Sequence, residues 1–331
     1  MADIQLSMGF NDYDHVRDLF TARVKPEGIQ LTCLQMRVEE VFHRFSANLE
    51  WDVSEISFGF TCSMIAAGES PIVAIPVFPS RVFRHSSIYV RSDGPVSGPE
   101  DLAGVRIGVP QWAQTATVFV RGWMSDTLGI PMSAVQWFQS GVEHPGRVDP
   151  AQVRLPEGVE RHVVTDRSLM QMMDAGELDA IITAQPPIAF DQGDPKIRRL
   201  FPDYRAVEEA YFDQTGIFPI MHVVAIRREQ YEKNPWIARN LFNAFNEARE
   251  HSVFRINAIG QSRIAVPWLP ETVERVSARV FGDGDYWPYG IEQNRTTIEA
   301  FLKYCFEQGV TSRHLAPEEV FAQESLTEFK I

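Results

Sequence analysis

Two arginines and a histidine lie within five residues of one another, directly after a hydrophobic stretch. The segment FPSRVFRHSSIYV, residues 78–90, contains Arg81, Arg84 and His85. The guanidinium group of arginine is a planar donor that matches a carboxylate with two parallel hydrogen bonds. The cluster therefore predicts a binding site for one or two carboxylates, and the alternative is a solvated charged loop.

A second candidate for chemistry is His222, which lies in an apolar stretch within residues 211–228. A histidine in such a stretch is often a core residue whose ring nitrogens are satisfied by neighbours. A desolvated histidine can also act as an acid or base, because imidazole titrates close to neutral pH. Both interpretations stay open at the level of the sequence.

Two further segments carry polar side chains that could bind an anion. QWAQTATVF, residues 111–119, places Gln114 and Thr115 at the expected start of a helix. Free N–H groups and the helix dipole favour anions there, and the plainer interpretation is an ordinary N-cap. The turn EHPGR adds His144 and Arg147 as binding candidates, with a simple loop as the alternative.

Composition and missing motifs exclude several classes of protein. The net charge of −13 argues against a nucleic-acid partner, because phosphate binding needs a basic face. No HExxH, GxSxG, Walker or GxGxxG pattern occurs, so protease, serine hydrolase and nucleotide-binding functions lose support. We predict no cofactor, although a divalent metal held by His85, His144 or His222 with nearby carboxylates stays open.

The sequence also predicts the compartment. No run of 18 apolar residues occurs, so we expect no membrane partner, and residues 1–10 lack the features of a secretory signal. Cys33, Cys62 and Cys305 are widely spaced and form no CxxC pair, which indicates free thiols in a reducing compartment. We therefore expect a cytoplasmic protein, and a homo-oligomer stays open.

Hydrophobic periodicity predicts an α/β fold in two parts. In the first part, strands alternate with helices, and the expected helices cover residues 14–24 and 38–49. A segment rich in Gly, Pro and Ser follows at residues 91–104, and a second series then begins with a helix at 115–128. We predict two lobes, with the following division: residues 1–91 and 187–331, including the C-terminal helices, in lobe 1, and residues 92–186 in lobe 2.

The loops that follow the expected strands are the places to look for a ligand. In open α/β sheets, ligands bind outside the carboxyl ends of the strands. This rule adds Asn11, Asp12, Tyr13 and Ser57 to the candidate binding residues.

Several long segments of the chain resemble the 4,5-dihydroxyphthalate decarboxylase family. The similarity runs through nearly the whole chain in the same order. The segments that carry it are PVFPSRVFRHSSIYV (76–90), DLAGVRIGVPQWAQTATVFVRG (101–122), MDAGELDAIITAQPP (173–187), LFPDYRAVEEAYFDQTGIFPIMH (200–222) and DYWPYGIEQNRTTIEAFLKYCFEQG (285–309).

The resemblance implies a fold and an activity. The fold is that of the type II periplasmic binding proteins, two α/β lobes with a ligand cleft between them, here with extra C-terminal helices. The activity is the conversion of 4,5-dihydroxyphthalate to protocatechuate and carbon dioxide, which makes a small aromatic carboxylate the substrate. The turn QWAQTAT leaves open a different aromatic acid.

The implied reaction needs a carboxylate anchor, a proton donor over the ring carbon, and a group that faces the ring hydroxyls. We expect His85 to be the donor, with His222 as the second candidate. The remaining roles fall to Arg81 and Arg84 as the anchor, helped by Thr115, and to Glu55, Asp12 or Tyr13 at the hydroxyls.

Two alternatives stay open. The chain could bind an aromatic carboxylate without catalysis, because this fold suits a binding protein equally well. It could also be a metal-dependent decarboxylase of another aromatic hydroxy acid.

Overall fold

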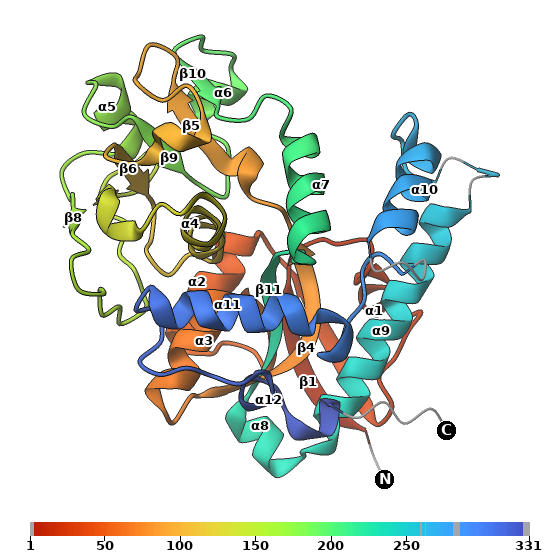
Figure 1. Cartoon of the computed structure of the whole chain (residues 1–331). Helices are drawn as coiled ribbons and strands as arrows, with labels where there is room; N and C mark the ends of the chain where they lie inside the picture. The colour runs from red at the N-terminus through yellow and green to blue at the C-terminus, as the bar shows by residue number, and fades with distance from the viewer. Residues whose placement is uncertain (1–2, 259, 262, 281–284, 327–331) are drawn as a thin grey trace.

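The computed structural model describes residues 3–258, 260–261, 263–280 and 285–326. Within these residues the strands form two separate sheets, which lie in the two lobes seen in Figure 1. Sheet A has five strands in the order β2-β1-β3-β11-β4, and sheet B has six in the order β10-β5-β9-β6-β7-β8. The predicted two-lobed α/β fold is confirmed.

The strands are short and are flanked by helices. Sheet A consists of β1 (Ile4–Phe10), β2 (Ile29–Gln35), β3 (Val53–Ser57), β4 (Ile72–Arg81) and β11 (Ile220–Arg227). Sheet B consists of β5 (Ile88–Arg91), β6 (Arg106–Val109), β7 (Gln136–Gln139), β8 (Arg161–Val163), β9 (Ala180–Ile182) and β10 (Ile197–Arg199).

The helices cover both sheets and continue beyond them toward the C-terminus. Those up to β11 are α1 (Arg17–Phe20), α2 (Val38–Asn48), α3 (Phe58–Ala67), α4 (Thr115–Leu128), α5 (Leu169–Asp174), α6 (Ile188–Asp191) and α7 (Tyr204–Thr215). Those after it are α8 (Arg228–Lys233), α9 (Trp236–Asn257), α10 (Leu269–Arg279), α11 (Arg295–Glu307) and α12 (Pro317–Val320).

The register of sheet A brings distant parts of the chain to one edge. β1 runs parallel to β2 and β3, whereas β11 lies antiparallel between β3 and β4. His222, near the start of β11, therefore pairs with Ser57 at the end of β3 and with Ser80 near the end of β4. The loops after β1, β3 and β4 meet the beginning of β11 at this edge.

The chain crosses between the sheets twice. It leaves sheet A after Arg81, enters sheet B at Ile88, and returns through α7 after Arg199. The strands β5 and β10 thus belong to sheet B although they lie outside the predicted segment 92–186. Both strands are too short to show a clear periodicity in the sequence. The division into domains itself stays a prediction.

The helix α1 is shorter than the sequence pattern indicates. We expected a helix over residues 14–24, but the structure has only Arg17–Phe20. The backbone turns into the left-handed region at Ala22, with a φ of 54°, and this ends the helical path. By contrast, α4 begins and ends at the predicted residues, Thr115 and Leu128.

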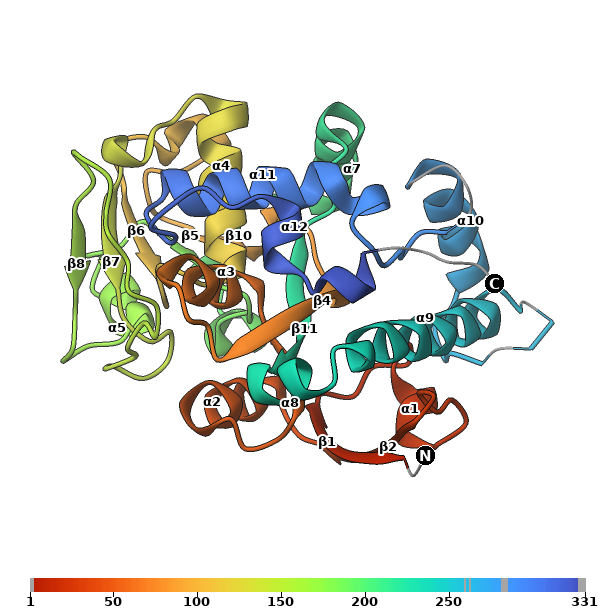
Figure 2. The same ribbon diagram turned by 90° about the horizontal axis from the view of Figure 1, so that it is seen from below.

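The C-terminal helix α11 joins the two halves of the molecule. It packs against α3 and α4, and Figure 2 shows it lying across both. Directly after it, Gln308 accepts a hydrogen bond from Arg121 Nε at 2.8 Å and donates one to the Val118 carbonyl at 2.9 Å. Arg121 is 1% exposed and its guanidinium lies 4.0 Å from the Trp112 ring centroid. The amide of Gln308 therefore compensates part of the cost of a buried cation.

The structure can be compared with two sequence-based expectations, which concern the cysteines and membrane-spanning helices. Cys33, Cys62 and Cys305 are free thiols. Among the described residues, no helix is long and apolar enough to cross a membrane.

We expect Gln308→Ala to lower the free energy of unfolding by about 1.5–3 kcal/mol, because a hydrogen bond to a buried charged group is lost. Urea unfolding followed by circular dichroism measures this. The matched control is Gln214→Ala, since Gln214 is exposed on α7, and surface substitutions of this kind change stability by about 0.5 kcal/mol or less. Equal effects of the two substitutions would contradict the role given to Gln308.

Candidate functional site

The centre of the candidate site is the Glu55 carboxyl group, which is fully buried in β3. Tyr13 donates its hydroxyl proton to Glu55 Oε1 at 2.5 Å, and the backbone N–H of Asn11 donates to Oε2 at 3.2 Å. His222 Nδ1 lies 2.6 Å from the same Oε1. The loop after β1 and the strand β11 thus converge on one carboxyl group of β3.

The ring of His222 is held in a defined orientation. Its Nδ1 faces Glu55, and its edge packs against the Phe42 ring of α2, with centroids 4.8 Å apart. The side chain is 17% exposed, so part of the ring faces solvent. A histidine whose Nδ1 is bonded to a carboxylate has its Nε2 available to give or take a proton.

Burial and the neighbouring Glu55 carboxylate raise the pKa of Tyr13 well above its ordinary range. Tyr13 therefore keeps its proton at neutral pH and remains a donor to Glu55. Sequence reasoning placed Asn11, Tyr13 and Glu55 among the candidates, and the structure brings them together with His222.

The first residue of α4 contacts the end of β3, next to the strand position of His222. Thr115 Oγ1 lies 3.1 Å from Ser57 Oγ and accepts a hydrogen bond from the Gly59 N–H at 3.0 Å. A Cβ at Gly59 would lie 2.5 Å from the Ala113 carbonyl oxygen, so glycine is required for this approach. Gln114, at the N-cap of α4, has a buried Oε1 without a hydrogen-bond partner among the described residues. The predicted pair of Gln114 and Thr115 thus borders the site.

Arg84 lies in the segment that crosses from sheet A to sheet B. Its guanidinium contacts the Met221 sulfur at 3.0 Å and donates to the Ala184 carbonyl at 3.2 Å. Burial lowers its pKa to about 10, which still leaves it charged at neutral pH. Arg84 lines a small pocket together with His85, Trp123 and Tyr211. Within the described residues it forms no ion pair that would use up its charge.

Arg81 does not share this environment. It is 4% exposed, and its Nη2 donates to the Pro288 carbonyl at 2.8 Å and to the Asn294 side chain. The aromatic rings of Phe78 and Phe218 lie 5.2 Å from its guanidinium carbon. These contacts hold the C-terminal segment against β4, so Arg81 and Arg84 do not form one joint anchor.

His85 is buried among aromatic rings. Its ring centroid lies 4.8 Å from that of Trp123 and 5.0 Å from that of Tyr211, and its ring nitrogens have no hydrogen-bond partner among the described residues. Desolvation lowers its pKa to about 4, so the ring is neutral at pH 7. The ordinary histidine pKa that favoured His85 as the first proton donor therefore does not hold here, and a carboxylate partner is found at His222 instead.

The remaining predicted residues lie on outer loops. Asp12 and His144 are exposed. Arg147 is also exposed and donates from Nη2 to Gln111 Oε1 at 3.2 Å. The structure brings none of these three side chains into hydrogen-bonding contact with Glu55.

Sequence reasoning missed one histidine at this edge. His15 Nε2 lies 2.9 Å from the Pro79 carbonyl oxygen, and its ring centroid is 5.3 Å from that of Tyr13. Burial lowers its pKa to about 4. Its position four residues after Asn11, in a loop at the carboxyl end of a strand, is the sequence feature that could have revealed it.

In the part of the chain that the structure describes, no group of three or more His, Cys, Asp and Glu side chains is arranged to hold a metal ion. The Glu55 group contains two such side chains, Glu55 and His222, and a phenol. This arrangement suits proton transfer, because a carboxylate bonded to Nδ1 holds the imidazole in a fixed orientation.

Two curated proteins are similar to this chain over most of its length. The 4,5-dihydroxyphthalate decarboxylase of Comamonas testosteroni is 34% identical over 332 residues, covering 100% of both chains. The chain belongs to the 4,5-dihydroxyphthalate decarboxylase family. The enzyme of the same name from Pseudomonas putida is 37% identical over 204 residues, which cover 61% of this chain and 79% of that one. No family model matches the sequence.

Solved structures support the fold. The periplasmic aliphatic sulphonate binding protein SsuA from Escherichia coli has a TM-score of 0.53 at 13% identity, covering 97% of this chain and 98% of that one. A putative periplasmic sulfonate-binding protein from Methylobacillus flagellatus has a TM-score of 0.55 at 13% identity, covering 99% and 92%. The predicted resemblance to periplasmic binding proteins in fold is confirmed.

We expect the His85 ring to stay neutral down to about pH 4. Since its pKa in the folded chain lies below the ordinary 6.5, the unfolded chain binds the proton more readily. Its contribution to stability is complete above pH 6.5 and is lost as the pH falls toward 4, by about 3 kcal/mol in total. NMR titration of ring-labelled histidine measures the pKa directly.

The variant His85→Asn serves as the control for this titration. It assigns the resonance, and its free energy of unfolding should fall less steeply between pH 6.5 and 4 than that of the parent chain. A His85 resonance that titrates near pH 6.5 would contradict the burial argument.

Proposed function

We propose that this chain decarboxylates a hydroxylated phthalate-type acid, with 4,5-dihydroxyphthalate as the first substrate to test and protocatechuate and carbon dioxide as products. The observation that carries the proposal is the Glu55–His222 pair, 2.6 Å apart, at the edge where the two sheets meet. Membership of the decarboxylase family supports the reaction class.

The proposed reaction is a proton-for-carboxyl exchange on the ring. The hydroxyl para to one carboxylate pushes electron density onto the carbon that carries this carboxylate. An acid protonates that carbon, the bond to the carboxylate breaks, and its electron pair returns to the ring as carbon dioxide leaves. One proton is consumed and one carbon dioxide is released for each substrate.

His222 is the proton donor in this proposal. In its protonated form, Nδ1–H would donate to Glu55 and Nε2–H would face the ring carbon. Tyr13 and the Asn11 N–H fix the Glu55 carboxylate from the other side. Glu55 thus orients the imidazole and stabilises its positive charge before the proton is given away.

Arg84 is the proposed anchor for the carboxylate that remains on the ring. Its charge is unpaired by any carboxylate in ion-pair contact among the described residues, and its hydrogen bonds go to a sulfur, a carbonyl and, at 3.4 Å, the Ser87 hydroxyl. These contacts are weaker than a bidentate bond to a carboxylate, which a substrate would offer. Gln114 Oε1 can accept a hydrogen bond from a ring hydroxyl.

We expect His222→Asn to lower turnover of 4,5-dihydroxyphthalate by about 10²–10⁴-fold, because positioned acid catalysis contributes about this factor. Substrate affinity should change little. Turnover is measured by the release of carbon dioxide and by chromatographic detection of protocatechuate. In deuterated water the product should carry one deuterium at the vacated ring carbon.

Two controls accompany this experiment. His43→Asn, on the exposed face of α2, should keep normal turnover. Chelator treatment before the assay tests for a metal-dependent reaction. If His222→Asn retains its turnover, the donor is another group, and if purified protein binds the acid without releasing carbon dioxide, the chain is a binding protein.

We expect Arg84→Ala to raise KM by at least about 30-fold, since losing one partner of a buried charged hydrogen bond costs about 2–5 kcal/mol. The matched variant is Arg81→Ala, whose partners are Pro288 and Asn294. Arg81→Ala should lower the melting temperature and change KM little. The opposite pattern, with Arg81→Ala acting mainly on KM, would reverse the assignment of the two arginines.

A further inference from the structure

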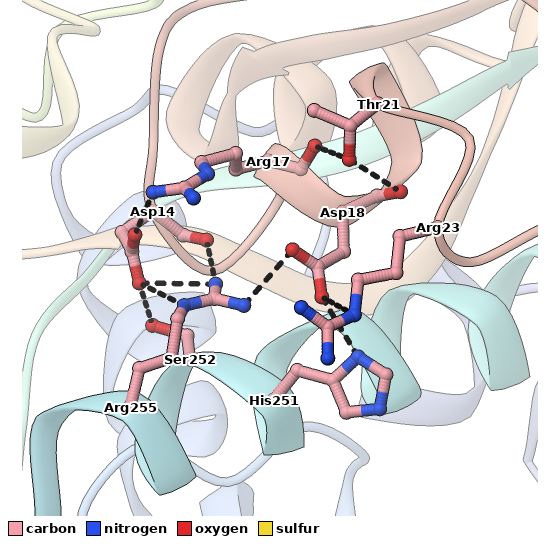
Figure 3. Close-up of polar contacts among 8 residues, drawn as sticks. All are labelled: Asp14, Arg17, Asp18, Thr21, Arg23, His251, Ser252 and Arg255. Atoms are coloured by element: carbon pink, nitrogen blue, oxygen red, sulfur yellow. Dashed lines mark hydrogen bonds and ion pairs between the residues drawn. The ribbon is translucent and has the colours of Figure 1, made fainter. Parts of the chain in front are cut away.

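A charged cluster lies where the loop that carries Tyr13 continues into α1. Figure 3 shows that Asp14 and Asp18 point toward α9, and that Arg255 reaches both. In the sequence, Arg255 lies more than 230 positions after Asp14 and Asp18. The cluster lies outside the Glu55 group, but Asp14 directly follows Tyr13.

Arg255 is the centre of the cluster. Its Nη1 donates to Asp18 Oδ1 at 2.9 Å, and its Nη2 donates to the backbone carbonyl of Asp14 at 2.9 Å and to Asp14 Oδ2 at 3.1 Å. Ser252 donates its hydroxyl proton to Asp14 Oδ2 at 2.6 Å, and His251 Nδ1 lies 2.7 Å from Asp18 Oδ2. Asp18 is 2% exposed. One guanidinium therefore holds both carboxylates and a backbone carbonyl.

The loop needs such support because it has little of its own. The helix α1 has four residues, and no side chain caps its start. A helix this short is marginal without outside contacts. The bond from Arg255 to the Asp14 carbonyl fixes the Asp14–His15 peptide group, and the bonds to the Asp14 carboxylate hold the side chain of the same residue. Asp14 directly follows Tyr13, so these bonds restrict the loop that presents Tyr13 to Glu55.

The chemistry of the cluster also favours a positioning role over a purely stabilising one. Buried ion pairs add little net stability, because desolvation offsets their attraction, and apolar side chains often serve as well. Directed hydrogen bonds fix the direction of the backbone, whereas apolar contacts do not. Arg255 shares with His251 and Arg23 the compensation of the buried Asp18 carboxylate, and the bond to Asp18 helps to keep the guanidinium in place.

We propose that Arg255 is a positioning residue, which holds the Tyr13 hydroxyl on Glu55 and thereby the Glu55 carboxylate on His222. Its kinetic effect rests on the proposed function. Arg255→Met should lower kcat for 4,5-dihydroxyphthalate by about 10–100-fold with a small change in KM, as expected when a catalytic group is displaced by about an ångström.

A double-mutant cycle with Tyr13→Phe separates positioning from general destabilisation. In the Tyr13→Phe background, Arg255→Met should lower kcat by no more than about 2-fold, because residues that act through one another are not additive. Arg255→Lys keeps a positive charge for Asp18 but cannot bond to both carboxylates and the Asp14 carbonyl. Its kcat should therefore be lower than that of the parent chain, and its folded state should be more stable than that of Arg255→Met.

The matched control is Arg106→Met. Arg106 Nη2 pairs with Asp179 Oδ1 at 2.6 Å, and Asp179 is also buried, but this pair lies at the starting ends of the strands of sheet B. Arg106→Met should lower the melting temperature and leave kcat unchanged. Any loss of kcat it does cause should be independent of Tyr13→Phe.

A second readout does not depend on the reaction. The Tyr13 hydroxyl proton, in a 2.5 Å bond to Glu55, should give a far-downfield NMR resonance that is absent in Tyr13→Phe. Arg255→Met or Arg255→Lys should shift or broaden it, and Arg106→Met should not. An unchanged resonance in folded Arg255 variants, or equal kinetic losses in both Tyr13 backgrounds, would overturn the proposal. If the resonance shifts but Tyr13→Phe retains full activity, the positioning role stands and the catalytic role given to the Glu55 group fails.

Discussion

The burial of the Glu55 carboxyl group is the constraint on which the site depends. A charged group removed from water is costly unless it is paired and hydrogen-bonded. Glu55 meets this requirement with partners from two segments, the Asn11 N–H and the Tyr13 hydroxyl in the loop after β1 and His222 in β11. Loss of the Asn11 N–H would leave Oε2 without this partner, whereas loss of Tyr13 or His222 would leave Oε1 with one partner instead of two. The site therefore depends on the correct pairing of β1, β3 and β11.

This requirement explains why the antiparallel strand β11 matters. Its neighbours β3 and β4 end at the edge that carries the candidate site, whereas β11 begins there. An antiparallel strand presents an early residue beside the end of its neighbour, and β11 in this way places His222 beside Ser57, the last residue of β3. A sheet of parallel strands alone would lack this placement of the proposed acid–base partner.

The sequence was sufficient to predict the fold and the loops of the site, because these follow from local patterns. The alternation of strands and helices predicted an α/β fold, and the apolar periodicity of residues 115–128 matched α4. The pairing of Glu55 with His222 was not predictable in the same way. These residues are 167 positions apart, and their contact depends on the register of β11 against β3. A sequence pattern does not specify the register of two distant strands.

Neighbouring residues with similar chemistry also proved to have different surroundings. Arg81, Arg84 and His85 lie within five positions of one another, but they belong to two environments. Arg81 is the last residue of β4 and faces the C-terminal segment, whereas Arg84 and His85 line one small pocket beside aromatic rings. The sequence cluster therefore did not show which of the two arginines lies in this pocket.

Proteins of this fold can close two lobes on a ligand, and closure alone accounts for binding. Chemistry requires in addition a proton donor whose position does not vary. In this chain the proposed donor His222 and its partner Glu55 both belong to strands of sheet A, paired along β3 and β11. The proposed carboxylate anchor Arg84 lies in the segment that joins the two sheets. In the proposed reaction the substrate is thus held by the connecting segment, while the proton is delivered from a side chain fixed on a strand.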